Sequence, residues 1–247
     1  MKRAGFYDGL WAGEWRDLPS HGPLSYTRQR LMLRELGALD HPDTRLLDVG
    51  CGDGTFLYRL KQRFPALEVA GIDFSVAAKE GAPESLRAAL QVGDVEKLTE
   101  HYETSSFDAV VSCEVLEHVE DPSAVLSGIT QVLKPGGVAV FTVPLGMQHW
   151  SELDDAGQHL RRFEPGEFEE LVSDAGMVVN HSYGWGGPVA RPYYAMSQKV
   201  GSKNLAASAK TSFGKAAGYL LQAAFRIDDF FPTDKGFQLI CRAERAK

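Results

Sequence analysis

Between residues 45 and 144 the chain alternates short apolar runs, rich in β-branched residues, with longer stretches whose apolar positions recur at helical spacing. This alternation is typical of a parallel sheet with helices on both faces. We therefore expect an α/β, doubly wound fold with crossover helices over 55–64, 75–89 and 122–133, the last one stopped and turned by Lys134-Pro135-Gly136-Gly137. The expected strands are 45–49, 67–72, 89–92, 107–112 and 138–143.

Helices and strands are also expected on either side of this region. A helix over 166–176 and strands over 177–182 and 237–243 follow it, and 22–38 has the periodicity of an amphipathic helix. Near the start of the chain, one face of an earlier helix would carry three aromatic residues spaced four apart: Tyr7, Trp11 and Trp15. That face either closes over a ligand or packs on the core.

We divide the chain into three parts on this basis. Residues 1–40 form an N-terminal helical lid, residues 41–182 together with 236–247 form the core, and residues 183–235 form a helical cap inserted before the last strand. The cap is expected to determine substrate specificity, because it is inserted beside the carboxyl ends of the strands.

The charge of the inserted cap differs from that of the body. From residue 175 to 227 there is no acid, while the six basic residues are Arg191, Lys199, Lys203, Lys210, Lys215 and Arg226. This pattern indicates either an anionic partner or a solvated helical face. The segment 213–225 is apolar on one side, which fits core packing, a dimer interface or peripheral membrane contact.

Composition narrows the class of protein. The chain has 247 residues, is 44% hydrophobic and carries a net charge of -7, values of a globular protein that buries a sizeable core. Cys51, Cys113 and Cys241 lie far apart, which suggests neither a disulfide framework nor a cysteine zinc site. Without an apolar leader or an apolar run long enough to span a bilayer, we expect a cytoplasmic protein.

The first expected strand ends in LLDVGCGDGT, residues 46–55. Glycines at 50, 52 and 54 allow a tight turn and close approach of a ligand to the backbone, and the following helix offers unpaired amides. A dinucleotide fingerprint would need glycine at 55 and would leave Asp48 unexplained, so this loop disfavours a nicotinamide oxidoreductase. No lysine follows the glycines, which excludes a P-loop.

Four further motifs follow in order: VAGID ending at Asp73, Gly93-Asp94-Val95, FDAVVSCEVLEHVEDP over 107–122, and LKPGG over 133–137. With the glycine loop they make the chain resemble class I S-adenosylmethionine-dependent methyltransferases, in particular the subgroup of ubiquinone-biosynthesis and natural-product enzymes. The resemblance covers residues 45–144 and implies a Rossmann-like, seven-stranded sheet with an antiparallel last strand.

The resemblance also implies where the cofactor S-adenosylmethionine lies. Asp48, Gly50, Cys51 and Gly52 would line its methionine and ribose part. Asp73 would accept both ribose hydroxyls, a bidentate geometry suited to a carboxylate. The remaining implied contacts are Phe74 near the adenine, Asp94 and Val95 at its edge, and Cys113 and Glu114 beside the sulfonium.

Glu114, Glu117 and His118 would share one face of a short helical turn directly after the strand that carries the cofactor pocket. Two carboxylates and an imidazole form a candidate site for Mg, Mn or Zn. Relatives with an ExxEH segment use it as metal ligands, some with a later histidine, and His159 is at about that place here. In metal-free relatives the histidine acts as a base or shapes the pocket. Both readings stay open, with Glu117 and His118 as the catalytic candidates.

The resulting prediction is methyl transfer to a small-molecule acceptor, at a hydroxyl oxygen, because the motif of methyltransferases acting on nucleobase or amide nitrogens is absent after the fourth strand. An anionic acceptor would be bound by three candidate arginines, Arg161, Arg162 and Arg191. The alternatives are metal-dependent 2′-O-methylation of an RNA terminus, N-methylation of a small amine, and a cofactor-binding protein without transferase activity. Nucleic acid is disfavoured by a sequence pI of about 5.5. Oligomeric state is left undetermined.

Overall fold

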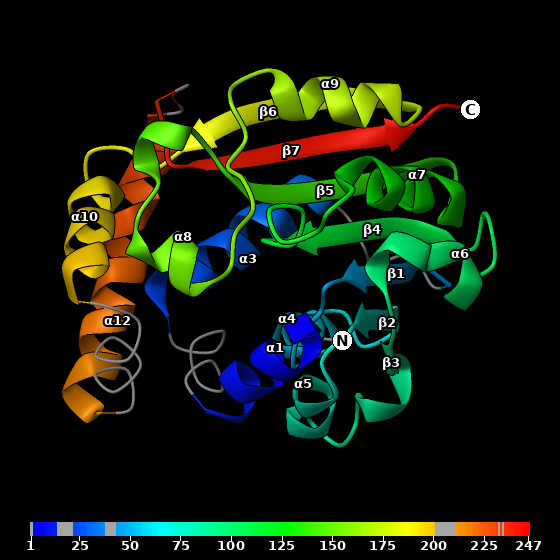
Figure 1. The fold of residues 1–247 in the computed structure, drawn as a ribbon, viewed down its shortest axis with the longest axis horizontal. Helices are drawn as coiled ribbons and strands as arrows, with labels where there is room; N and C mark the ends of the chain where they lie inside the picture. Colours follow the sequence, from blue (N-terminus) through cyan, green and yellow to red (C-terminus); the bar gives the residue numbers. More distant parts are fainter. Residues whose placement is uncertain (1, 14–21, 38–42, 201–210, 232, 234) are drawn as a thin grey trace.

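The computed structural model describes residues 2–13, 22–37, 43–200, 211–231, 233 and 235–247. The predicted Trp15, Lys203 and Lys210 lie outside the described residues. Figure 1 shows one sheet with helices in front of it and behind it. Its helices are α1 (Lys2–Ala12), α3 (Pro23–Leu36), α4 (Thr55–Arg63), α5 (Val76–Gly81), α6 (Leu98–His101), α7 (Pro122–Val132), α8 (Glu152–Ala156), α9 (Glu167–Asp174), α10 (Ala190–Val200) and α12 (Ser212–Ala224).

The sheet has seven strands in the order β3-β2-β1-β4-β5-β7-β6. The first five pair in parallel, whereas β7 is antiparallel to both β5 and β6, which confirms the predicted doubly wound sheet with an antiparallel last strand. The strands are β1 (Arg45–Val49), β2 (Glu68–Asp73), β3 (Leu90–Val92), β4 (Phe107–Cys113), β5 (Leu133–Pro144), β6 (Met177–Trp185) and β7 (Gln238–Arg245).

Each face of the sheet is covered by its own set of helices. One apolar cluster joins the sheet to α6, α7 and α9, with the aromatic side chains of Phe107, Phe141 and Phe168 fully buried in it. The other face packs against α3 and α4 through residues such as Met32 and Leu57. Burial on both faces explains why the central strands are almost continuously apolar.

Three predicted boundaries were wrong in detail. The helix expected over 75–89 ends at Gly81, because Ala82 is extended before Pro83, and a separate 3₁₀ turn covers Arg87–Ala89. The helix expected to end at residue 133 ends one residue earlier, at Val132, and residues 134–137 bulge within β5 instead of preceding it: Leu133 pairs with Phe107 and Val138 with Ala109. Strand β6 continues to Trp185, so the first three residues of the expected cap belong to the sheet.

The described cap helices and α8 lie beside the carboxyl ends of the parallel strands. In Figure 1, α8, α10 and α12 lie on the left, the side toward which β4 and β6 point. A third apolar cluster holds the cap to the core through α3, with Leu31, Trp185, Phe225 and Ile240 buried in it. Among the described residues, no helix combines the length and apolar character needed to cross a membrane.

Candidate active site

One cavity of about 1000 Å³ opens at the carboxyl ends of the parallel strands. All ten residues assigned to the cofactor from the sequence lie on its wall, together with His118, His159 and Arg162. Glu117, Arg161 and Arg191 are not part of that wall. In this type of fold, ligands bind outside the carboxyl ends of the strands where the strand order reverses, here between β1 and β4.

The glycine loop between β1 and α4 forms the floor of the cavity. Gly50 and Gly52 have φ angles of 77° and 52°, in the left-handed region that favours glycine. A Cβ on Gly50 would collide with the side chain of Val115, and one on Gly52 would collide with the ring of Trp11. The loop therefore needs glycine both for its backbone conformation and for the close approach of its neighbours.

Asp73 joins the glycine loop to the end of β2. One of its carboxylate oxygens accepts a hydrogen bond from the Gly52 amide at 2.9 Å, and the other accepts one from the Ser75 amide at 2.9 Å. Burial raises the pKa of Asp73, and burial together with the charge of Asp73 raises the pKa of Asp48 to about 8. Two buried acids in one wall favour a ligand that carries positive charge.

Helix α1 docks across this half of the cavity with the aromatic face expected from the sequence. Tyr7 is buried and meets Phe74 edge to face, with ring centroids 5.0 Å apart. Asp8 anchors the helix, because its carboxylate accepts hydrogen bonds from the Ser75 hydroxyl at 2.6 Å and the Ala77 amide at 3.1 Å. The described part of the aromatic face thus closes over the predicted cofactor site.

Tyr7 also determines which nitrogen of His118 carries a proton. The Tyr7 hydroxyl donates to the carbonyl of Gly157 at 2.9 Å, and its oxygen lies 2.7 Å from Nδ1 of His118. Since a phenol has a single proton, both contacts are satisfied when His118 Nδ1–H donates to the Tyr7 oxygen. The nitrogen without a proton is then Nε2, which can act as a base or as a metal ligand.

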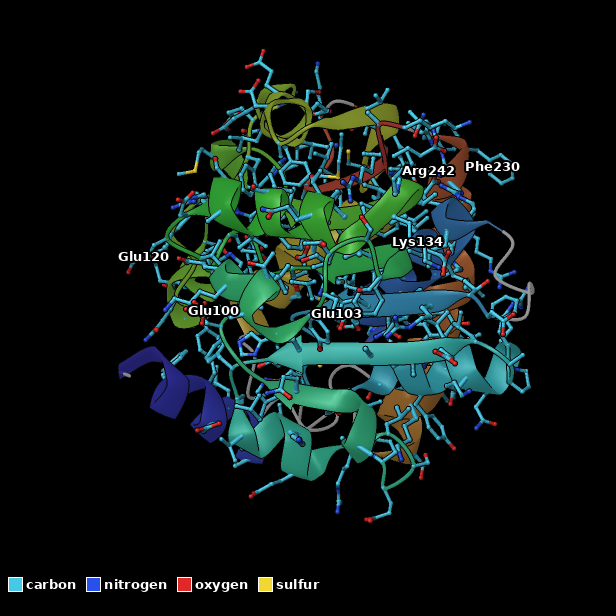
Figure 2. All side chains as sticks on the ribbon, turned by 90° about the vertical axis from the view of Figure 1, so that its right-hand side faces the viewer. Glu100, Glu103, Glu120, Lys134, Phe230 and Arg242 are labelled. Atoms are coloured by element: carbon cyan, nitrogen blue, oxygen red, sulfur yellow. The ribbon has the colours of Figure 1, made fainter. Side chains whose placement is uncertain are left out.

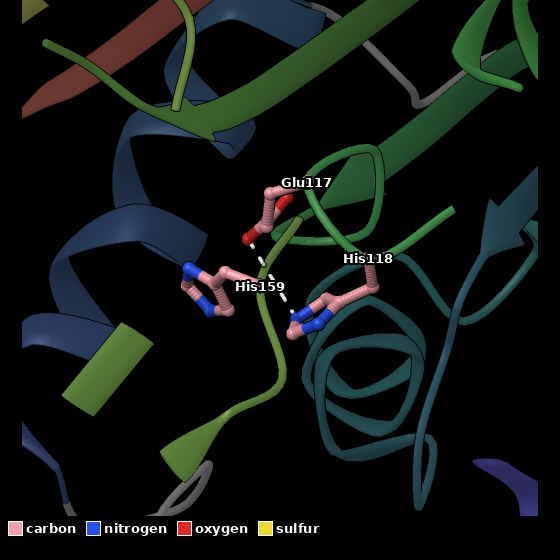
Figure 3. A group of neighbouring side chains, drawn as sticks. All are labelled: Glu117, His118 and His159. Carbon is pink, nitrogen blue, oxygen red and sulfur yellow. Dashed lines mark ion pairs between the residues drawn. The ribbon is translucent and has the colours of Figure 1, made fainter. Parts of the chain in front are cut away.

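Glu117, His118 and His159 form a compact group (Figure 3), in which one ligand atom from each lies within 4.8 Å of the others. Nε2 of His118 is 3.8 Å from the Glu117 carboxylate. Both carboxylate oxygens of Glu117 are buried without a hydrogen-bond partner in the described part of the chain. The pKa of Glu117 is raised, first by this burial and second by the negative charge of Glu114. Such a carboxyl needs a proton or a bound cation for stability.

Glu114 does not join this group, contrary to the expectation of one helical face. Its φ angle is 57°, so the backbone turns away from a helical path directly after β4. The carboxylate instead lies 3.2 Å from Nη1 of Arg28 and accepts hydrogen bonds from Gln238 at 2.6 Å and from the Thr142 hydroxyl at 3.2 Å. Glu114 remains on the cavity wall, but its partners are three side chains from the lid and the sheet.

His159 is held by a buried ion-pair network. Its Nδ1 is 2.9 Å from a carboxylate oxygen of Asp154, and the same carboxylate accepts hydrogen bonds from Nε and Nη2 of Arg162 at 2.8 and 3.0 Å. Burial would raise the pKa of Asp154, but the adjoining His159 imidazole and the hydrogen-bonded Arg162 guanidinium outweigh it and hold that pKa well below its usual range. The sequence indicated His159 but not Asp154, whose signal was its place in a Ser-x-x-Asp capping box.

The three arginines expected to bind an anionic acceptor have other partners. Arg162 is buried and engaged by Asp154, Arg161 donates to the carbonyl of Glu120, and Arg191 donates to the carbonyl of Lys235. Arg28, which the sequence did not single out, lines the cavity but faces Glu114. Both arginines on the cavity wall are therefore already opposed by a carboxylate.

The part of the cavity beyond His118 is mainly apolar and aromatic. Its wall comes from α3, α10, α12 and the start of β7. Tyr194 stacks on Phe237 with ring centroids 4.0 Å apart and an interplanar angle of 5°. The sequence pattern indicated the cap but did not single out the apolar side chains of this wall, which are Leu24, Tyr193, Tyr194, Phe213, Leu221 and Phe237.

Comparison with known proteins agrees with this geometry. A family model described as a methyltransferase domain matches residues 24–182. The ubiquinone biosynthesis O-methyltransferase of Alkalilimnicola ehrlichii is 31% identical over 190 residues, covering 70% of this chain and 74% of that protein. The protein of the same name from Xanthomonas oryzae is 40% identical over 102 residues, but the match spans only 42% of its length and 40% of this chain.

Solved structures show the same fold at lower sequence identity. A phosphoethanolamine N-methyltransferase from Haemonchus contortus has a TM-score of 0.68 and 20% identity, with 99% of this chain and 60% of that chain covered. A geranyl diphosphate C-methyltransferase from Streptomyces coelicolor has a TM-score of 0.63 and 17% identity, with 90% and 80% covered. The glycine loop, the acid after β2 and the family match together show that this chain belongs to the class I S-adenosylmethionine-dependent methyltransferases.

Proposed function

We propose that this methyltransferase transfers the methyl group to a hydroxyl oxygen of a small, mainly apolar acceptor, with His118 as the base. The observation that carries the proposal is the position of His118. It lies on the wall of one continuous cavity, between the residues assigned to the cofactor and the apolar residues of α10 and α12. An acceptor held in the apolar part would present its hydroxyl to the histidine and the methyl group together.

The chemistry required of the chain is modest. The sulfonium of S-adenosylmethionine already activates the methyl group, so the protein must align the acceptor oxygen with it and remove one proton. His118 Nε2 takes the hydroxyl proton while the oxygen forms a bond to the methyl carbon. The carbon–sulfur electron pair stays on sulfur and leaves S-adenosylhomocysteine. The Tyr7 contact places the ring proton on Nδ1, which leaves Nε2 as the basic nitrogen.

The apolar wall supports a neutral aromatic acceptor more than an anionic one. Among the described residues, the two arginines on the cavity wall already face carboxylates, so an acceptor carboxylate or phosphate that used them would have to displace Glu114 from Arg28 or Asp154 from Arg162. The names of the Alkalilimnicola and Xanthomonas relatives support transfer to oxygen. The likeness to the Haemonchus N-methyltransferase concerns the fold and does not favour nitrogen.

A divalent metal is the second part of the proposal. The two orphaned oxygens of Glu117 and the neighbouring imidazoles of His118 and His159 fit a cation, because one carboxylate and two neutral histidines suit several divalent metals. The Asp154 carboxylate would orient His159, as outer partners of metal-bound histidines commonly do. When bound, such a cation would lower the pKa of a coordinated hydroxyl. The same group favours the RNA-terminus alternative, which we keep as a competing outcome.

The test uses chelator-treated protein with S-adenosylmethionine carrying a labelled methyl group. The acceptor probes are a catechol with an alkyl tail, a benzoate-bearing catechol, an aliphatic amine and an oligonucleotide with a free 3′-terminal ribose, each with and without Mg, Mn or Zn. We expect label on the alkyl catechol oxygen, and a large loss of rate in His118→Ala. Label transferred solely to the amine or the oligonucleotide would overturn the assignment to a small hydroxyl acceptor. A rate independent of added metal would remove the metal from the proposal.

A further inference from the structure

A second hollow lies on the surface between α3 and the 3₁₀ segment Phe225–Phe230 that follows α12, away from the catalytic cavity. Its volume is about 470 Å³, and no residue of it lines the active site. Four of the seven residues around it are arginines and one is an acid: Arg30, Leu33, Arg34, Arg63, Arg226, Asp229 and Phe230. The hollow thus carries three net positive charges on a protein whose net charge is -7.

Carboxylates neutralise only part of this charge. Asp229 forms a two-point ion pair with Arg30, at 2.5 and 2.8 Å, and lies 3.5 Å from Arg34, whose Nε is also 3.3 Å from the Glu35 carboxylate. Nε of Arg30 is buried without a hydrogen-bond partner in the described part of the chain. Arg63 and Arg226 are exposed, and neither has a carboxylate partner among the described residues. Unopposed guanidinium groups favour phosphate, which they can bind in a bidentate way.

Large apolar side chains of α12 and of the segment after it project to solvent. Phe230, which lines the hollow, is 82% exposed, and Ile227, next to Arg226 in the chain, is 50% exposed. Leu220, seven positions before Ile227, is 73% exposed. In Figure 2 Phe230 projects at the right-hand edge of the molecule, whereas the acidic residues Glu100 and Glu120 lie toward the left. Most monomeric proteins do not expose several large apolar side chains along one segment unless a partner covers them.

We propose that this basic and apolar surface docks onto an anionic lipid bilayer. The arginines would contact lipid phosphates while Phe230, Ile227 and Leu220 enter the interface between headgroups and acyl chains. A nucleic acid would use the positive charge but not the aliphatic side chains, and an apolar protein partner would not use the four arginines. The acidic remainder of the chain would be repelled by the same membrane, so the charge asymmetry sets the orientation of docking.

Docking in this way has a consequence for the active site. Helix α12 presents Leu220 to solvent, while Leu221 and Gly218 of the same helix line the catalytic cavity, and Phe213 lies at the cavity wall while 84% exposed. The bilayer would therefore lie close to the apolar part of the cavity. An apolar acceptor could enter it without crossing water, a step that rests on the proposed function, whereas the docking itself does not.

The experiment is flotation of the full chain with vesicles, without cofactor or acceptor. Vesicles of phosphatidylcholine alone are compared with vesicles that also contain phosphatidylglycerol, at low and high salt. We expect binding only to the anionic vesicles, weakened by salt. The double variant Arg63→Glu/Arg226→Glu should weaken binding by more than roughly fivefold for each basic side chain lost. Phe230→Ser should weaken it at high salt as well.

Matched controls separate this surface from general charge and hydrophobicity. Arg87→Glu/Lys97→Glu makes the same change in net charge at exposed positions near the other edge of the sheet, and Val178→Ser removes an exposed apolar residue from β6. Both should bind as the wild type does. Equal loss in variants and controls, or no binding to anionic vesicles, would overturn the proposal. The proposal would also be overturned if an oligonucleotide competed with vesicle binding and Phe230→Ser left that binding unchanged. None of these changes touches the catalytic cavity, so methyl transfer to a water-soluble acceptor serves as a check on folding.

Discussion

Replacement of Asp154 by alanine removes the counter-charge of a buried arginine. Asp154 is 1% exposed and Arg162 is 6% exposed, and the two side chains form parallel hydrogen bonds of 2.8 and 3.0 Å. The same carboxylate also accepts hydrogen bonds from the amide and hydroxyl of Ser151. In the variant the guanidinium keeps its charge, and the partners that it retains, the Leu145 carbonyl and the Tyr194 hydroxyl, are neutral.

The expected loss is large for a single substitution. Breaking a buried ion pair by removing one partner costs about 3–5 kcal/mol, because an uncompensated charge stays buried. For a chain of this size each kcal/mol lowers Tm by about 2–4 °C, so Tm should fall by roughly 6–20 °C. Calorimetry and urea unfolding both measure the effect. Glu152→Ala, an exposed acid two residues earlier in α8, is the matched control and should change stability little.

The pH dependence gives an independent check. Because the folded-state pKa of Asp154 is depressed, its stabilising contribution is present above the unfolded pKa, near 4, and is lost as pH falls through the folded pKa. The difference between wild type and Asp154→Ala should therefore be full at neutral pH and shrink below about pH 4. A loss below about 1 kcal/mol, or an equal loss in Glu152→Ala, would refute the reasoning. Pairing Asp154→Leu with Arg162→Met should restore most of the stability.

Three further substitutions test the active site. Tyr7→Phe should lower kcat about fivefold to tenfold, with KM for S-adenosylmethionine unchanged. Nitrogen NMR should show that His118 loses its preference for the Nδ1–H form, and an unchanged spectrum would contradict the tautomer assignment. Glu117→Gln should weaken the binding of divalent cations at least tenfold, measured by calorimetric titration of chelator-treated protein. An affinity equal to that of the wild type would remove Glu117 as a ligand. Burial, and then the charge of Asp73, raise the pKa of Asp48 to about 8, so the stability that protonated Asp48 contributes is lost as pH rises toward that value. The Tm of ligand-free Asp48→Asn should therefore rise relative to that of the wild type between pH 5 and 9. A Tm difference that stays constant over this range would argue against the shifted pKa.

Much of the cofactor half could be predicted from consecutive residues. Glycine is required at positions 50 and 52 by the local backbone conformation, and Asp73 is the last residue of its strand, so each carries its signal in its own segment. The strands of the core were found for the same reason, since burial on both faces leaves an apolar run. Even the break in the helix after residue 81 had a local signal, in Pro83, that the helical periodicity outweighed.

The acceptor half depended on contacts between distant segments. Glu114 has the spacing of a metal ligand, but a positive φ angle and Arg28, 86 positions earlier in the chain, direct it elsewhere. Arg162 has the chemistry to bind an anionic acceptor, but Asp154 satisfies it. Tyr7 and His118 are separated by 111 positions, and only the docking of α1 brings them within hydrogen-bond distance.

The sequence by itself determined the doubly wound sheet and the glycine loop, and it indicated the segment around His118 that we propose takes part in the reaction, because periodicity and glycine conformation act over a few neighbouring residues. The tertiary structure alone decided which charges are paired, which apolar side chains line the cavity and which face solvent. The physical reason is that a charged or apolar side chain acquires its role from the groups packed around it. Those groups come from segments that the folded sheet, lid and cap bring together.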